Sequence, residues 1–188
     1  MREISTLESG TPLVELDKLV GLFFDQVEDL GRFQLVSAQQ LPEPHRSLLD
    51  HEHHMTVTVE KFHSSPVNVK VLRERRDQNA YSREICLLKS SDQQTVQYGI
   101  VRLNFDHLDE DVQDEILKHQ LPLGRILIQH DVLRQVRLLG LYEVSPSDQL
   151  IQCLGGLGGS PNQSVYGRTA IIYCNEEPAI ELLEIVTV

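Results

Sequence analysis

The sequence predicts an α+β fold, a single domain over residues 1–188 in which an antiparallel sheet carries helices on one face. Three observations support this prediction. Apolar and polar residues alternate in pairs of segments joined by short polar turns, which indicates consecutive hairpins. Two other segments carry apolar residues at helical spacing. The length of 188 residues with 40% hydrophobic content suits one core, and residues 1–12, which lack an apolar pattern, are expected to be flexible.

The first third of the chain is predicted to contain helices followed by a hairpin. In residues 16–30 the apolar positions recur at steps of three and four, and Gly31 follows as a helix stop. Residues 45–51 follow a Pro-rich break and predict a short helical segment. Residues 55–59 and 67–71 alternate on either side of a Ser-Ser-Pro turn, so we expect them to form the first hairpin.

The middle of the chain predicts a second hairpin and a surface helix. A charged connection over residues 73–79 leads into strands at 80–88 and 95–104, separated by a polar turn. Residues 106–119 carry apolar side chains at helical spacing and Asp residues in the first turn, where they interact favourably with the helix dipole.

The last third predicts three more strands. Residues 133–144 alternate as a strand, and the glycine-rich residues 154–161 predict a mobile loop. Strands at residues 168–174 and 179–186, joined by a polar turn, complete the sheet.

Charge and cysteine content exclude several classes of protein. The 17 basic and 28 acidic residues give a formal net charge of −11, which opposes binding to nucleic acids and to anionic membrane surfaces. The three cysteines form no CxxC pair and are too few for a disulfide framework, which favours a reducing cytoplasm. No apolar run reaches the length of a membrane span, so we expect no membrane partner.

Arg83 is the main candidate for ligand binding. Strand alternation places it on one face with the apolar residues Tyr81, Ile85 and Leu87. A guanidinium in apolar surroundings needs an anion, and its planar fork binds a carboxylate through two hydrogen bonds. The anion could be a substrate, but Glu184 or Glu181 could also supply a structural ion pair, and an exposed edge strand would leave Arg83 solvated.

Glu184 is the second candidate, because it shares a face of the last predicted strand with Ile180, Leu182 and Val186. A carboxylate on an apolar surface is a candidate for a buried site. Glu181 lies on the opposite face, and strand alternation alone does not decide which of the two points into a pocket.

The histidines and glycines match no established catalytic or metal motif. His51 and His53 would share a strand face with His54 pointing away, and neither the HExxH spacing nor a second ligand cluster is present, so no metal site is predicted. The glycine run lacks the features of a phosphate-binding loop, and a GxSxG nucleophile motif is missing.

Four separated segments together resemble the bacterial chorismate pyruvate-lyase (4-hydroxybenzoate synthase) family and its divergent relatives, from about residue 41 to residue 186. The segments are Leu48-Leu49-Asp50 with His54-Met55-Thr56, Ser82-Arg83-Glu84-Ile85, Pro122-Leu123-Gly124-Arg125-Ile126-Leu127, and Tyr166-Gly167-Arg168 with Pro178 and Glu184. Two features depart from the family pattern. His54 replaces a serine, and the interval from Pro178 to Glu184 is one residue longer, so Glu181 or a β-bulge near Glu184 stays possible.

The resemblance implies an internal ligand cavity and cofactor-free cleavage of chorismate to 4-hydroxybenzoate and pyruvate. In this interpretation Arg83 holds the ring carboxylate and Glu184 is the catalytic carboxylate. Met55, Leu123 and Gly124 would line the site or bind substrate through their backbones, and Arg168 is a candidate for the second carboxylate.

The alternative is a non-catalytic protein that binds a small aromatic acid, because the same fold resembles the effector-binding modules of some bacterial transcription regulators. Residues 1–40 offer one predicted helix, which is too little for a helix-turn-helix domain. A regulator would therefore need its DNA-binding half from a partner. The sequence predicts no oligomeric state.

Overall fold

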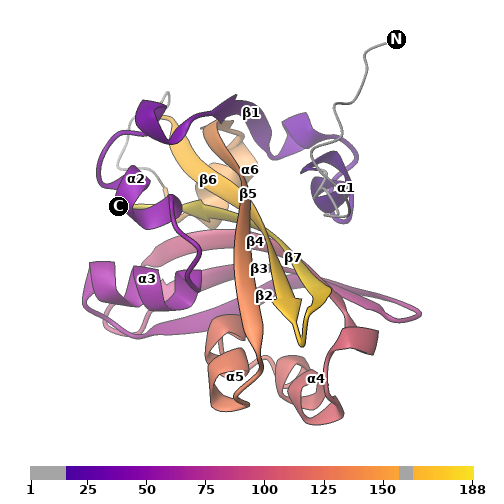
Figure 1. Ribbon diagram of the computed structural model, residues 1–188. Coiled ribbons are helices and arrows are strands. Elements are labelled where there is room, and N and C mark those ends of the chain that lie inside the picture. Colours follow the sequence, from indigo (N-terminus) through magenta and orange to yellow (C-terminus); the bar gives the residue numbers. More distant parts are fainter. Residues whose placement is uncertain (1–15, 157–162) are drawn as a thin grey trace.

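A computed structural model describes residues 16–156 and 163–188, which contain a seven-stranded antiparallel sheet with helices on both faces (Figure 1). The strand order is β1-β5-β6-β7-β4-β3-β2. The strands are β1 (Gly31–Val36), β2 (Val67–Asp77), β3 (Ala80–Lys89), β4 (Thr95–Asn104), β5 (Arg134–Pro146), β6 (Val165–Cys174) and β7 (Glu177–Val186). The predicted α+β domain with an antiparallel sheet is thus confirmed, although helices cover both faces and not only the one expected.

The central strands form where alternation predicts them. Strands β3 and β4 pair as the predicted hairpin, with Arg83 opposite Val101, and β4 then pairs with β7. Strands β6 and β7 form the closing hairpin, whose turn residues Asn175 and Glu176 have positive φ values of 52° and 72°. The pairing of β4 with β7 brings the two hairpins into one sheet, and it places Leu182 beside Val101.

Two helical layers create separate cores on the two faces of the sheet. Helices α2 (His45–Leu49), α3 (Met55–His63), α4 (Glu110–Leu117) and α5 (Leu123–Gln129) pack on the face that carries Arg83. Helices α1 (Leu16–Val20) and α6 (Asp148–Cys153) pack on the opposite face, against the core that contains Tyr98 and Ile100. In Figure 1, α2 and α3 lie along one side of the twisted sheet, and α4 and α5 lie at the end opposite α1.

The prediction of a strand over residues 55–59 was wrong, because these residues begin α3. The alternating Met-Thr-Val-Thr-Val run also satisfies helical spacing, and packing decides between the two. Met55, Thr56 and Val59 are buried together against the sheet, as positions i, i+1 and i+4 of a helix. The predicted first hairpin is therefore absent, and β2 pairs with β3 instead.

The charged residues 73–77 belong to β2 and do not form a connection. Strand β2 is at the edge of the sheet, where charged side chains are exposed and protect the edge from pairing with other chains. Because these residues are polar, the sequence does not predict that the strand continues beyond residue 71. The turn to β3 is formed by Gln78, which has φ of 44°, and Asn79.

The long helix predicted over residues 16–30 is interrupted. Helix α1 ends at Val20, a 3-10 turn (η1) follows at Val27–Asp29, and Gly31 starts β1. The buried side chains of Leu19, Phe24 and Leu30 contribute to one core without a continuous helix. Similarly, the helix predicted over residues 106–119 divides into a 3-10 turn (η3) at Phe105–His107 and α4. A further 3-10 turn (η2) covers Ala38–Gln40.

Helices α5 and α6 were not predicted. The expected flexibility of residues 1–12 and most of the predicted mobile loop, residues 157–161, lie outside the described residues. Within residues 16–156 and 163–188, no helix is long and apolar enough to cross a membrane.

Candidate functional site

A small cavity of about 40 Å³ lies between the sheet and the layer formed by α3 and α5. Its polar lining comes from β3, β4, β6 and β7, as Arg83, Gln97, Arg168 and Glu184, and its other walls are largely apolar. A water molecule needs about 10–15 Å³ of such space, and a cavity that binds benzene measures about 150 Å³. In this state the cavity therefore holds about three waters and is too small for an aromatic ring.

Arg83 is buried at the cavity without an ionic partner. Only 1% of its surface is exposed, and it lies on β3 opposite Val101. Its Nη1 donates a long hydrogen bond of 3.5 Å to the carbonyl oxygen of Ile116, and its Nε has no partner within the described residues. The Tyr81 hydroxyl and the Glu74 carboxylate lie near enough to favour the charged guanidinium. Burial lowers the pKa of this guanidinium, because the charged form loses its hydration. The structural ion pair considered from the sequence is thus not formed by the described residues.

Arg168, in contrast, donates hydrogen bonds to protein groups from all three nitrogens of its guanidinium. Its Nε donates to Oε2 of Glu184 at 2.8 Å, across the β6–β7 pair. Its Nη1 donates to the carbonyl oxygens of His51 at 2.7 Å and Leu49 at 3.4 Å, and its Nη2 donates to that of His53 at 3.1 Å. The guanidinium predicted to bind a second substrate carboxylate is therefore occupied by protein groups.

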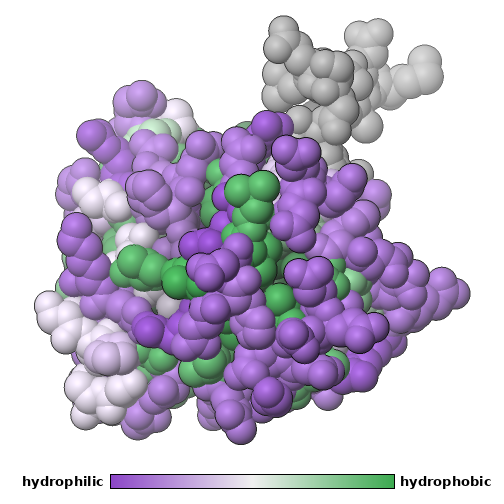
Figure 2. All heavy atoms as spheres, turned by 60° about the horizontal axis from the view of Figure 1, so that its bottom comes forward, coloured by the Kyte–Doolittle hydropathy of each residue, from purple (hydrophilic) through white to green (hydrophobic). Residues whose placement is uncertain are grey.

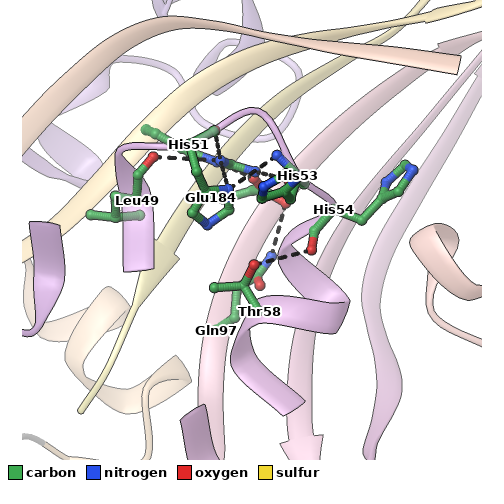
Figure 3. A network of polar contacts seen from close by, with 8 residues as sticks. Leu49, His51, His53, His54, Thr58, Gln97 and Glu184 are labelled. Carbon is green, nitrogen blue, oxygen red and sulfur yellow. Dashed lines mark hydrogen bonds and ion pairs between the residues drawn. The ribbon is translucent and has the colours of Figure 1, made fainter. Parts of the chain in front are cut away.

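These bonds hold a segment that we call the strap, residues 50–54, which connects α2 to α3 over the cavity (Figure 3). The rings of His51 and His53 stack with centroids 5.5 Å apart. His51 Nδ1 accepts a hydrogen bond from the backbone N–H of His53 at 3.1 Å. Burial is the main cause of the lowered pKa of His51, followed by the neighbouring Arg168 charge.

His54 ends the strap and is a cavity residue that sequence reasoning did not select. Its Nε2 accepts a hydrogen bond of 2.6 Å from Nε of Arg134 on β5. Its carbonyl oxygen accepts one from the Thr58 hydroxyl on α3 (Figure 3). Desolvation and the charges of Arg134 and Arg168 lower the pKa of His54 to about 4. The resemblance to the lyase family, which has serine at this position, was the signal that could have identified it.

Glu184 and Glu181 have different surroundings. Glu184 is 7% exposed at the cavity, where Gln97 donates to its Oε1 at 3.3 Å. Glu181 lies on the other face of β7 and forms an ion pair with Arg102 near the surface. The geometry therefore selects Glu184 as the carboxylate beside the cavity. Gln97 was also missed by sequence reasoning, and its Oε1 is buried without a hydrogen-bond partner among the described residues.

Met55 and Leu123 are the first residues of α3 and α5, and both line the cavity. The first N–H groups of a helix have no acceptor within the helix, and neither His54 nor Pro122, the residues before these helices, caps them with a side chain. Gly124 allows the two helices to approach, because a Cβ at this position would lie 2.9 Å from Oγ1 of Thr56. The predicted binding residues thus lie around one cavity, and Gly124 also has a packing role.

Tyr81, which was predicted to share a face with Arg83, is not among the residues that line the cavity. Its hydroxyl donates to Glu74 at 2.8 Å and lies 2.8 Å from Nε2 of His119. Within the described residues, no group of three or more His, Cys, Asp or Glu side chains is arranged to hold a metal ion.

Comparison of the sequence with protein-family models and with curated proteins finds no match. Among solved structures, the effector domain of PhnF from Mycobacterium smegmatis aligns with a TM-score of 0.51 and 11% identity, over 71% of this chain and 87% of that domain. PhnF itself aligns with a TM-score of 0.50 over 70% of this chain, which spans 62% of the length of that protein. The ligand-binding domain of a putative GntR-family transcriptional regulator from Bordetella bronchiseptica aligns at 13% identity, over 65% of this chain and 86% of that domain, with a TM-score of 0.45.

At these identities the likeness concerns the fold. This fold is related to that of chorismate lyase, although none of the three structures above is that enzyme. The chain thus has a fold similar to the effector domain of PhnF.

Proposed function

We propose that this chain binds a small organic acid in the cavity, with the carboxylate of the ligand paired to Arg83. The observation that carries the proposal is the buried Arg83 guanidinium, whose Nε has no partner within the described residues. An unpaired buried charge is costly, so its retention is explained if a ligand supplies the counter-ion. The fold likeness to the effector domain of PhnF is compatible with ligand binding, but the proposal rests on the cavity.

The charge balance of the cavity specifies one negative charge on the ligand. Among the described lining residues, Arg83 and Arg168 are cations and Glu184 is the only carboxylate. Because Arg168 and Glu184 form an ion pair at 2.8 Å, Arg83 provides the excess positive charge. The uncapped N–H groups at the start of α3 carry partial positive charge, which favours an anionic ligand as Arg83 does. The apolar walls, which include Ile85, favour a ligand with an apolar or aromatic body.

The proposal is tested by calorimetric titration of the protein with 4-hydroxybenzoate. We expect binding by the unmodified chain, and a loss on the order of 100-fold or more in the Arg83→Met variant, because an interaction with a buried charge is removed. The matched control is Arg75→Met, which removes an exposed cation from the neighbouring strand β2. Equal affinities in Arg83→Met and the unmodified chain would contradict the proposal.

The stability of Arg83→Met separates loss of binding from loss of fold. Replacing an unpaired buried cation by an apolar side chain of similar length removes a desolvation cost. We therefore expect the urea midpoint of this variant to be unchanged or raised. A strongly lowered midpoint would instead show that Arg83 supports the fold through contacts with the protein.

Catalysis of chorismate cleavage is the second candidate function, and the position of Glu184 favours it. Glu184 lies two strands across the sheet from Arg83 and one side-chain row further along, offsets of roughly 10 Å across the strands and roughly 7 Å along them. The hydrogen bond from Arg168 holds the carboxylate beside the cavity, where it can act as a proton acceptor. In this mechanism Glu184 takes the proton from C4 of chorismate. The released electron pair completes the aromatic ring, the C3–O bond breaks, and the departing enolpyruvate gains a proton to become pyruvate.

Incubation with chorismate decides between the two functions. Equimolar 4-hydroxybenzoate and pyruvate, both lost in Glu184→Gln, would support the lyase. Binding of 4-hydroxybenzoate without turnover of chorismate would support a non-catalytic binding domain.

A further inference from the structure

We infer that the surface pocket outside His54 is an outer subsite of the same ligand site, and that it takes an apolar substituent on the organic acid held by Arg83. This inference rests on the proposed function and names the class of ligand more closely. The expected ligand is an amphipathic acid, with a carboxylate at one end and an apolar extension at the other.

The outer pocket is an open surface hollow of about 620 Å³, whereas the inner cavity measures about 40 Å³. Small-molecule sites span roughly 300–1,000 Å³. An acid that places its carboxylate on Arg83 therefore needs additional space for its remaining atoms. The outer pocket supplies that space beside the strap, between the start of α3 and the end of α5.

His54 connects the two spaces, because it is the one residue found among the described lining residues of both. Its ring accepts the hydrogen bond from Arg134 and is only partly buried where the two spaces meet. Arg134 in turn donates to the carbonyl oxygens of Val132 at 2.9 Å and Leu127 at 3.4 Å, which fixes it at the pocket wall. Breaking the single bond between Arg134 and His54 would free the ring to rotate and join the inner cavity to the outer pocket.

The lining of the outer pocket identifies the substituent as apolar. Val57, Ile128 and Leu133 line it with 47%, 39% and 66% of their surfaces exposed, and they are half of the six large exposed hydrophobic residues in the described part of the chain. Figure 2, which brings the end with α4 and α5 forward, shows hydrophobic side chains at the surface among hydrophilic ones. Glu52, Asp131 and Arg134 also line this pocket, and because the two carboxylates outnumber the one cation, the lining opposes a second anionic group on the ligand.

The test compares the binding of two probe acids by calorimetry, 4-hydroxybenzoate and 4-butoxybenzoate. We expect the butoxy compound to bind on the order of tenfold more tightly, because its chain moves from water to an apolar wall. Val57→Ser and Leu133→Ser should each reduce this gain, measured as the ratio of the affinities for the two acids. Leu35→Ser is the matched control, since Leu35 is 68% exposed on the distant strand β1.

Each outcome separates this inference from the proposed function. If neither acid binds the unmodified chain, both are overturned. If 4-hydroxybenzoate binds and the butoxy group adds no affinity, the outer subsite is overturned and the proposed function stands. A gain that survives in both serine variants would also overturn it, because the extension would then lie elsewhere. Faster association of 4-butoxybenzoate with His54→Ala than with the unmodified chain would support the connection through His54.

Discussion

Arg83 and Arg168 show how one residue type serves two purposes in the same cavity. Each is 1% exposed, but Arg168 bonds Glu184 and three carbonyl oxygens, whereas Arg83 has one long bond of 3.5 Å to Ile116. Alternation in the sequence predicts that both could face inward. It does not reveal that residues of the strap, which lie 115–117 positions away in the chain, form hydrogen bonds with Arg168. The distinction between a structural and a ligand-binding arginine therefore depends on tertiary contacts.

The Arg168–Glu184 pair is expected to be important for stability. Glu184→Gln should lower the free energy of unfolding by about 3 kcal/mol, because it leaves the buried Arg168 cation without its counter-ion. Glu181→Gln is the matched control on the same strand, because its partner Arg102 is partly exposed, and it should cost less than about 1 kcal/mol. Urea unfolding of both variants measures the difference. Similar losses in the two variants would mean that burial does not distinguish these pairs.

His54 is expected to make stability depend on pH. Folding lowers its pKa from 6.5 to about 4, mainly through desolvation. Between these values the unfolded chain binds a proton that the folded chain does not. The stability that His54 contributes is therefore fully present above about pH 6.5 and is lost as the pH falls toward 4, by roughly 3 kcal/mol in total.

Urea midpoints at pH 7 and pH 5 measure this dependence. His54→Gln, which cannot titrate, should show a smaller difference between the two pH values than the unmodified chain. His130→Gln replaces an exposed histidine and should leave the difference unchanged. An equally steep pH dependence in His54→Gln would assign the effect to other groups, such as His45 and His51, whose pKa values are also lowered by burial.

At the scale of elements, the contact between α3 and α5 brings the predicted segments around Met55 and Leu123 together at one cavity. The four inner strands β3, β4, β6 and β7 could be predicted, because apolar residues recur along each of them and polar turns separate them. Helix α3 could not, since its β-branched residues satisfy strand alternation as well as helical spacing, and only packing against β3 and its neighbours selects the helix. The second half of the edge strand β2, residues 73–77, could not be predicted, because its charged residues are typical of a connection. Charged residues at a sheet edge prevent pairing with other chains.

Gly124→Ala tests the close approach of α3 and α5. The added Cβ would lie 2.9 Å from Oγ1 of Thr56 and 3.3 Å from Cβ of His54, so one helix must shift. Although alanine favours helix formation, we expect a net loss of about 1–2 kcal/mol in the free energy of unfolding from this overpacking. Thermal unfolding of Gly124→Ala and of the Thr56→Ala/Gly124→Ala double variant measures it. The double variant should recover part of the loss, and no recovery would place the strain elsewhere.

At the scale of the whole molecule, a local positive site is enclosed in an acidic protein. The chain has 17 basic and 28 acidic residues, a net charge of 17 − 28 = −11, yet its cavity presents the unpaired Arg83. The overall field repels an anionic ligand during approach, and the buried guanidinium attracts it after entry. The two effects act at different distances, so salt should influence them differently.

The association rate of 4-hydroxybenzoate is therefore expected to rise by a factor of about two to five between about 20 mM and about 300 mM NaCl, because salt screens the long-range repulsion. The dissociation rate should change little, because the contact with Arg83 is shielded from solvent and ions. Stopped-flow binding measurements at several salt concentrations give both rates. An association rate that falls with salt would mean that the positive charges near the cavity, Arg83 and Arg134 among them, dominate the approach of the ligand over the net charge of the chain.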